Sequence, residues 1–136
     1  MKVFISHADT DAPLARKVAL SLQQAGMDVW YAENEIFPGD NWAAKIADGL
    51  EDSNAMVVLM TEHAVHSNMV RWSINFALGS LNFAHRLITV FVGDPSMLPE
   101  AEIPWILRQL KTINLPANGH VDEGITQITQ ALQAAA

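Results

Sequence analysis

Short apolar runs in this sequence alternate with longer stretches in which apolar residues recur every three or four positions. The short runs are typical of strands buried on both faces, and the spaced pattern is typical of amphipathic helices. The predicted strands are Lys2–Ser6, Asp28–Tyr31, Ala55–Met60, Leu87–Val92 and Thr112–Leu115. Because strands that alternate with helices require crossover connections, we expect an α/β fold: a flavodoxin-like, doubly wound, five-stranded parallel sheet with helices on both faces.

Four helices are predicted from these apolar positions and from residues that begin or end helices. The first follows an Asp11 cap, carries Leu14, Val18 and Leu22, and stops at Gly26. The second follows a cap at Asp40 or Asn41 and carries Trp42, Ile46 and Leu50. The third follows Ser67 or Asn68, carries Val70, Ile74, Ala77 and Leu78, and ends near Gly79. The fourth is Val121–Leu132, and a short helix is expected around Trp105–Leu110.

Length and composition indicate a single domain over residues 1–136. Half of the residues are apolar and 17% are charged, which is typical of a folded globular domain. The net charge is −7 and the eight lysine and arginine residues are scattered, so we expect neither nucleic acid nor a membrane surface as a partner. The N-terminal apolar run is too short for a signal peptide, and no run reaches the ~18 residues of a membrane span. We therefore expect a cytoplasmic protein.

The residues and motifs that the sequence lacks remove several classes of chemistry. Without cysteine there is no disulfide, no cysteine-ligated metal and no thiol nucleophile. The glycine-rich phosphate loop, the dinucleotide fingerprint G-x-G-x-x-G and the G-x-S-x-G elbow are also missing. A phosphoacceptor receiver domain has the same strand order, but it needs an aspartate at the end of the third strand, where this sequence has Met60-Thr61.

Ligands of open parallel sheets bind beyond the carboxyl ends of the strands, so the loops there hold the candidate residues. His63 and His66 are a conceivable metal pair, but no third ligand has suitable spacing, so we expect two solvent-facing histidines and no metal. Trp30 and Trp42 flank the long loop predicted at Ala32–Asp40, and each either stacks on a flat ligand or packs in the core. Phe37, beside the turn dipeptide Pro38-Gly39, is either tucked under this loop or exposed for a partner.

An ordered set of segments in this chain resembles a bacterial Toll/interleukin-1 receptor (TIR) domain. The resemblance runs from about Lys2 to Val92, and the remainder fits the last strand and helix of that family. The segments that carry it are Val3-Phe4-Ile5-Ser6-His7-Ala8, Gly26-Met27-Asp28-Val29-Trp30, Glu35-Ile36-Phe37-Pro38-Gly39-Asp40-Asn41-Trp42, Gly49-Leu50-Glu51-Asp52-Ser53, Met56-Val57-Val58-Leu59-Met60-Thr61, Ser67-Asn68-Met69-Val70 and Phe76-Ala77-Leu78-Gly79.

The resemblance implies a function and a site. Many TIR domains use NAD as substrate, with no separate cofactor, and break the bond between nicotinamide and ribose, sometimes cyclising the product in cell-suicide or immune signalling. The pocket for NAD or an ADP-ribose-like nucleotide would be formed by His7, Ala8, Trp42 and the first turns of the third helix. The segment Ala32–Asn41 corresponds to the BB loop of the family, so Phe37, Pro38 and Gly39 are expected to support self-association with other TIR domains.

The sequence departs from the family at the catalytic glutamate. Laying Ile74 to Gly79 on the family motif Glu-Ile-x-x-Ala-Leu-Gly places Ser73 where the glutamate belongs, and a register starting at Trp72 places Phe76 there. A neutral, short hydroxyl does not offset the positive charge that develops on ribose during cleavage. The resemblance therefore leaves two functions open: an NAD-processing TIR effector with impaired activity, and a non-catalytic TIR adaptor that acts through self-association.

Overall fold

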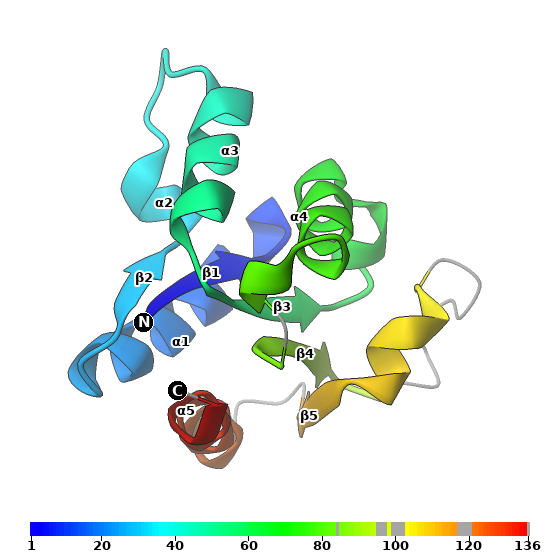
Figure 1. The fold of residues 1–136 in the computed structure, drawn as a ribbon. Coiled ribbons are helices and arrows are strands. Elements are labelled where there is room, and N and C mark those ends of the chain that lie inside the picture. The colour runs from blue at the N-terminus through cyan, green and yellow to red at the C-terminus, as the bar shows by residue number, and fades with distance from the viewer. Residues whose placement is uncertain (84, 95–97, 99–102, 117–120, 136) are drawn as a thin grey trace.

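The computed structural model describes residues 1–83, 85–94, 98, 103–116 and 121–135 of the chain (Figure 1). The five strands are β1 (Lys2–Ser6), β2 (Asp28–Trp30), β3 (Ala55–Met60), β4 (Leu87–Val92) and β5 (Lys111–Leu115). The α-helices are α1 (Ala12–Gln24), α2 (Ala32–Glu35), α3 (Trp42–Asp52), α4 (Asn68–Leu78) and α5 (Asp122–Ala135). Short 3₁₀ helices are η1 (Asp9–Asp11), η2 (Ala64–His66), η3 (Leu81–Phe83) and η6 (Trp105–Gln109).

All five strands pair in parallel, in the order β2-β1-β3-β4-β5. This confirms the predicted flavodoxin-like sheet, and β1, β3 and β4 begin and end at the predicted residues. Every residue of β3 is buried, as expected for a central strand that is covered on both faces. The direction of strand addition reverses between β1 and β3, and their carboxyl ends therefore flank the place where such sheets bind ligands.

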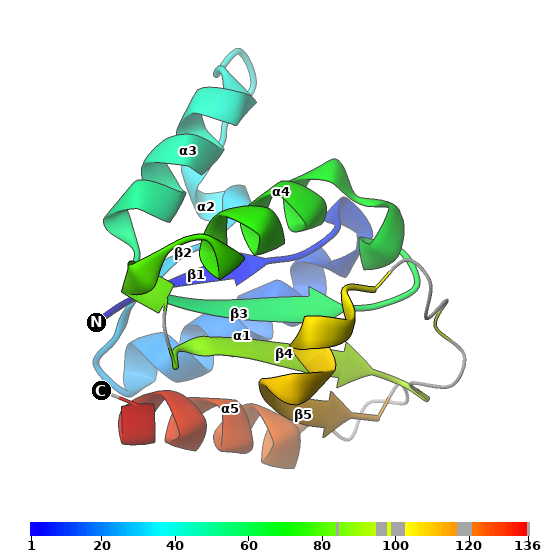
Figure 2. The ribbon, with the colours of Figure 1, turned by 45° about the vertical axis from the view of Figure 1, so that its right-hand side comes forward.

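Alternate residues of the strands feed two apolar cores, one on each face of the sheet. On one face Val3, Ile5 and Val57 pack with α1 and α5, and on the other Phe4 and Met56 pack with α3, α4 and η6. Figure 2 shows the two layers, with α3 and α4 on one side of the sheet and α1 and α5 on the other. The two faces hold β1 and β3 firmly, and so they fix the positions of the loops that follow these strands.

Several local predictions need correction. Part of the predicted loop Ala32–Asp40 is the short helix α2. Asp11 occupies the cap position of α1, but its carboxylate does not cap the helix and instead accepts a hydrogen bond from the Thr61 hydroxyl at 2.6 Å. Leu78, placed on the inward stripe of α4 by its spacing, is 41% exposed as the last residue of the helix.

For α3 and α4, the capping residue is one of the two residues that the sequence predicts for each helix. Asn41 caps α3 by accepting a hydrogen bond from the Ala44 N–H, and Ser67 caps α4 by accepting one from the Val70 N–H. No helix in the described part of the chain is both long and apolar enough to cross a membrane.

Candidate functional site

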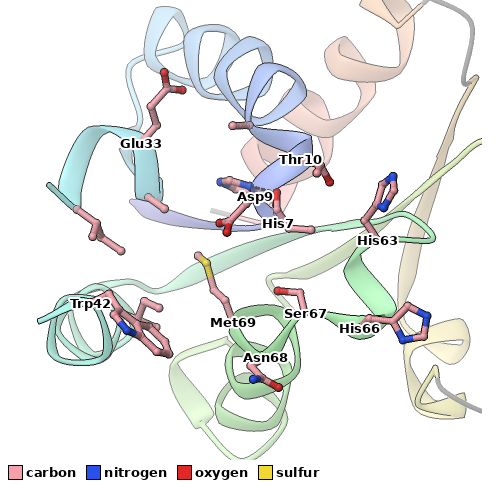
Figure 3. Close-up of a pocket in the computed structure, with 15 residues that line it drawn as sticks. His7, Asp9, Thr10, Glu33, Trp42, His63, His66, Ser67, Asn68 and Met69 are labelled. Atoms are coloured by element: carbon pink, nitrogen blue, oxygen red, sulfur yellow. Dashed lines mark hydrogen bonds between the residues drawn. The ribbon is translucent and has the colours of Figure 1, made fainter. Parts of the chain in front are cut away.

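A cavity of about 770 Å³ lies at the carboxyl edge of the sheet, beside the loops that follow β1 and β3 (Figure 3). This size is in the range of small-molecule sites, about 300–1,000 Å³. Fifteen residues line it: His7, Ala8, Asp9, Thr10, Ala12, Ala32, Glu33, Ile36, Trp42, Ile46, His63, His66, Ser67, Asn68 and Met69. The structure thus brings together His7, Ala8 and Trp42, the three residues that the resemblance assigns to substrate binding.

His7 follows the last residue of β1 and is only 2% exposed. Its Nδ1 donates a hydrogen bond to the Ala8 carbonyl oxygen at 2.7 Å, which fixes the proton on Nδ1 because a carbonyl only accepts. The other ring nitrogen, Nε2, is buried and has no hydrogen-bond partner among the described residues. Buried polar atoms are normally paired, so this nitrogen is an exception beside the cavity.

Trp42 begins α3 and forms the wall opposite β1, together with Ile36 and Ile46. Its indole stacks on that of Trp72 from α4, with ring centroids 5.3 Å apart and planes within 3°. The two side chains remain 48% and 44% exposed, so the stack stands at the surface rather than in the core. Trp42 therefore offers an aromatic surface to a flat ring of a ligand in the cavity, and the stack on Trp72 already fixes the orientation of this surface.

The first turn of α4 supplies the remaining wall through Ser67, Asn68 and Met69. Ser73 lies one turn further along the same helical face as Met69, since residues four apart on a helix are neighbours. It is fully buried and is absent from the lining of the cavity. Its hydroxyl bonds to the Val70 carbonyl at 2.9 Å and to the Ser6 hydroxyl at 2.5 Å, so Ser73 sits behind the cavity wall, with its hydrogen-bonding capacity used by the protein.

The charged groups at the cavity differ in their pairing and in their exposure. Glu33 of α2 accepts two hydrogen bonds from Arg16 of α1, at 2.6 and 3.2 Å, and this contact raises the pKa of the guanidinium. The pair ties α2 to α1 and offsets the charge of Glu33. Asp9 in η1 and His63 after β3 are exposed at the cavity.

Phe37 projects from the loop between α2 and α3 and is 58% exposed, which favours the exposed alternative over the tucked one. The loop is closed by the Asp40 N–H, which donates to the Phe37 carbonyl at 3.0 Å, and by the Phe37 N–H, which donates to the Asp40 carboxylate at 2.9 Å. Gly39 has a φ of +90°, a conformation that L side chains rarely adopt. The turn therefore holds Phe37 outward, beside Pro38.

The other candidates, Trp30, His63 and His66, differ in where the structure places them. Trp30 is 4% exposed and stacks on Phe4 in the core, with ring centroids 4.5 Å apart, so it has a packing role. His63 and His66 are both exposed and both line the cavity. Among the described residues, no group of three histidine, cysteine, aspartate or glutamate side chains is placed to hold a metal ion.

Sequence reasoning did not assign three residues to the site: Ile36 and Ile46, which line the cavity, and Trp72, which stacks on Trp42. Ile46 follows Trp42 by four positions, so the helical period alone indicates that both share a face. No local pattern indicates the contact of Trp72 with Trp42. The two residues are 30 positions apart in sequence, and their helices meet only in the folded chain.

A family model and curated bacterial relatives indicate one family for this chain. A model of the family described as TIR domain matches residues 3–129. The 2′ cyclic ADP-D-ribose synthase BtTIR of Bacteroides thetaiotaomicron is 33% identical over 86 residues, which cover 62% of this chain and 30% of that protein. The NAD(+) hydrolase PdTIR of Paracoccus denitrificans is 37% identical over 62 residues, which cover 45% of this chain and 21% of that protein. The chain thus covers less than a third of the length of either relative.

Among solved structures, a metazoan TIR-STING receptor from C. gigas, in complex with 2′,3′-cGAMP, superposes with a TM-score of 0.75. The superposition covers 96% of this chain and 38% of that one, at 22% sequence identity. This likeness shows a shared fold.

Proposed function

Since this chain belongs to the TIR domain family, we propose that its cavity binds NAD and that the protein breaks the nicotinamide–ribose bond slowly. The observation that carries the proposal is the meeting of His7, Ala8 and Trp42 around one cavity at the carboxyl edge of the sheet. Three segments far apart in sequence supply this cavity. Its aromatic wall suits a flat ring, and its polar groups suit ribose hydroxyls.

The bacterial relatives support the choice of ligand. One is named as a 2′ cyclic ADP-D-ribose synthase and another as an NAD(+) hydrolase, and both names refer to chemistry on the same dinucleotide or its product. NAD acts in this proposal as the substrate, with no separate cofactor.

Slow turnover follows from Ser73. Cleavage builds positive charge on ribose, and a carboxylate close to it stabilises the transition state. A buried serine whose hydroxyl is bonded to Ser6 and Val70 does not supply that charge. The loss of one strong electrostatic group costs on the order of a hundredfold to a thousandfold in rate.

Nicotinamide release from NAD by the parent chain, Ser73→Glu and Ser73→Gln tests this assignment. Gln is nearly the size of Glu but uncharged, so it controls for the added bulk. We expect Ser73→Glu to exceed both other proteins by about tenfold or more, in line with the worth of one electrostatic group. Equal rates in three folded proteins, checked by circular dichroism, would remove Ser73 from the catalytic position.

Binding is tested separately from turnover by titrating ADP-ribose into the parent chain and following amide NMR shifts. We expect saturable shifts at His7, Trp42 and Met69, with stacking on Trp42 supplying roughly 1–3 kcal/mol by analogy with bases on aromatic side chains. If no shift appears up to about 10 mM, a limit that corresponds to roughly 3 kcal/mol, the non-catalytic adaptor becomes the better account.

We also propose self-association through the loop that carries Phe37, Pro38 and Gly39. The support is the exposure of Phe37 on a closed turn that holds it outward. Light-scattering mass compares the parent with Phe37→Ala and with Leu20→Ala, which removes a similarly exposed apolar side chain from α1. We expect Phe37→Ala alone to lower the mass, and equal masses in all three proteins would contradict this proposal.

A further inference from the structure

A second cavity, of about 240 Å³, lies between α4 and Pro104, the residue that precedes η6. Its volume is below the usual range of small-molecule sites, about 300–1,000 Å³, so it suits a ligand that is smaller than a nucleotide. No described residue lines both this second cavity and the cavity proposed for NAD. A ligand of the second cavity is therefore independent of the proposed function.

The floor of the second cavity is apolar and buried. It is formed by residues from the end of β3, from η2 and from α4, each at most 7% exposed: Met60, Ala64, Val65, Val70 and Ile74. These side chains offer no strong hydrogen-bond donor or acceptor. A group that is buried against them must be apolar, because a polar group there would lose water without gaining a partner.

The rim of the second cavity carries a cation that lacks a charged partner. Arg71 is exposed, and its guanidinium donates one long hydrogen bond, at 3.5 Å, to the carbonyl oxygen of Val65. This contact places the guanidinium beside the floor, to which Val65 belongs. In the described part of the chain Arg71 forms no ion pair, so most of its N–H donors are available to a ligand.

A second donor lies next to Arg71 on the rim. Asn75 follows Arg71 by four positions on α4, so the two side chains are neighbours on one side of the helix, and both line the second cavity. The amide of Asn75 donates two N–H groups. The second cavity thus combines a buried apolar floor with a rim that donates hydrogen bonds and carries positive charge.

We infer that this second cavity binds a small monocarboxylate with an apolar body. The apolar body lies on the buried floor, and the carboxylate pairs with the guanidinium of Arg71 at the rim. A planar carboxylate matches a guanidinium through two parallel hydrogen bonds. Inorganic phosphate fits poorly, because it has no apolar part and its charged oxygens would face the floor without donors.

The test uses hydrocinnamate as the probe, because it joins a carboxylate to an apolar aromatic body. Two related compounds separate the contributions of its parts: hydrocinnamamide keeps the apolar body without the charge, and acetate keeps the carboxylate without the ring. The proteins are the parent chain, Arg71→Gln and the matched control Lys45→Gln, which removes a positive charge from an exposed position of α3 outside both linings. Amide NMR shifts during each titration give the affinity and the location of binding.

For hydrocinnamate and the parent chain we expect saturable shifts at Val65, Val70 and Ile74. Arg71→Gln should weaken this binding at least about threefold, as expected for the loss of a partly exposed charge-assisted contact, and Lys45→Gln should leave it unchanged. Hydrocinnamamide should bind the parent at least about threefold more weakly than hydrocinnamate, and equally to the parent and to Arg71→Gln. Acetate should give no saturable shifts at the floor residues.

Three results would overturn the inference. The first is the absence of saturable shifts with hydrocinnamate up to about 10 mM, which is tenfold weaker than a millimolar ligand. The second is a set of shifts centred on Ala8 and Trp42, which line the other cavity. The third is equal affinity of hydrocinnamate for Arg71→Gln and Lys45→Gln. A titration with ADP-ribose reports on the proposed function separately, so either proposal can fail while the other stands.

Discussion

At the scale of single residues, the pair Ser6 and Ser73 shows how one hydroxyl is committed to the fold. Ser73 donates to the Val70 carbonyl, so it accepts from Ser6, and both side chains have no exposed surface. The contact joins β1 to α4 about one helical turn beyond Met69, which lies in the cavity wall. A hydroxyl with two protein partners holds the wall in place and does not face the ligand.

This arrangement predicts the stability of three variants. Ser73→Ala leaves the Ser6 hydroxyl buried without an acceptor, which costs about 1–3 kcal/mol of unfolding free energy. Ser6→Ala/Ser73→Ala removes both hydroxyls, and the double variant should lose less than the sum of the two single losses. Urea unfolding measures all four proteins. Strictly additive losses would show that the two hydroxyls do not interact.

The sequence locates such residues but does not reveal their partners. Spacing placed Ser73 in the third predicted helix, yet the use of its hydroxyl depends on Ser6, 67 positions earlier. Trp42 was correctly placed at the start of a helix beside the long loop, while its stack on Trp72 depends on how two helices pack. Contacts of this kind arise from the tertiary structure and leave no local signal.

At the scale of elements, α3 packs closely on β2 because it presents a glycine to a large ring. A Cβ built on Gly49 would lie 2.6 Å from Cε2 of Trp30, well inside van der Waals contact. Trp30 in turn is stacked on Phe4 of β1, so it has little freedom to move away. The absence of a side chain at Gly49 therefore sets the distance between the helix that begins with Trp42 and the sheet.

Gly49→Ala should destabilise the protein although alanine favours helices. The gain in helix propensity is about 1 kcal/mol, and overpacking against a fixed ring costs roughly 1–3 kcal/mol, so we expect a net loss. Gly79→Ala is the matched control: its Cβ would meet no atom closer than 3.6 Å, and we expect no loss or a gain of about 0.4–1 kcal/mol. Thermal unfolding distinguishes the two, and equal melting temperatures would contradict the clash.

Elements with a strong periodic signal were predicted well, and the exception is informative. The apolar runs that form β1, β3 and β4 are bounded by polar residues. Because these strands are buried on both faces, apolar composition alone was enough to predict them. The four residues of α2 lie near Pro38-Gly39 and resemble a loop locally. This short helix is held by the Arg16–Glu33 contact and by the packing of Ala32 and Ile36 on the core, both of which are long-range.

At the scale of the whole molecule, net charge bears on the proposed self-association. Each chain carries −7, so two copies repel each other at low ionic strength. Phe37 is apolar and 58% exposed, and burial of its ring against another copy releases water independently of charge. Association is then the balance of a screened repulsion and an unscreened apolar attraction.

This balance predicts that salt strengthens association. Raising the ionic strength from 0.01 to 0.15 M shortens the screening length from about 30 to about 8 Å, so the repulsion falls while the contribution of Phe37 remains. Sedimentation velocity on the parent should show a larger associated fraction at the higher salt, and Phe37→Ala should remain smaller at both concentrations. A fraction that falls with salt would instead indicate an interface built on ion pairs, in which the exposed ring of Phe37 is not the main contact.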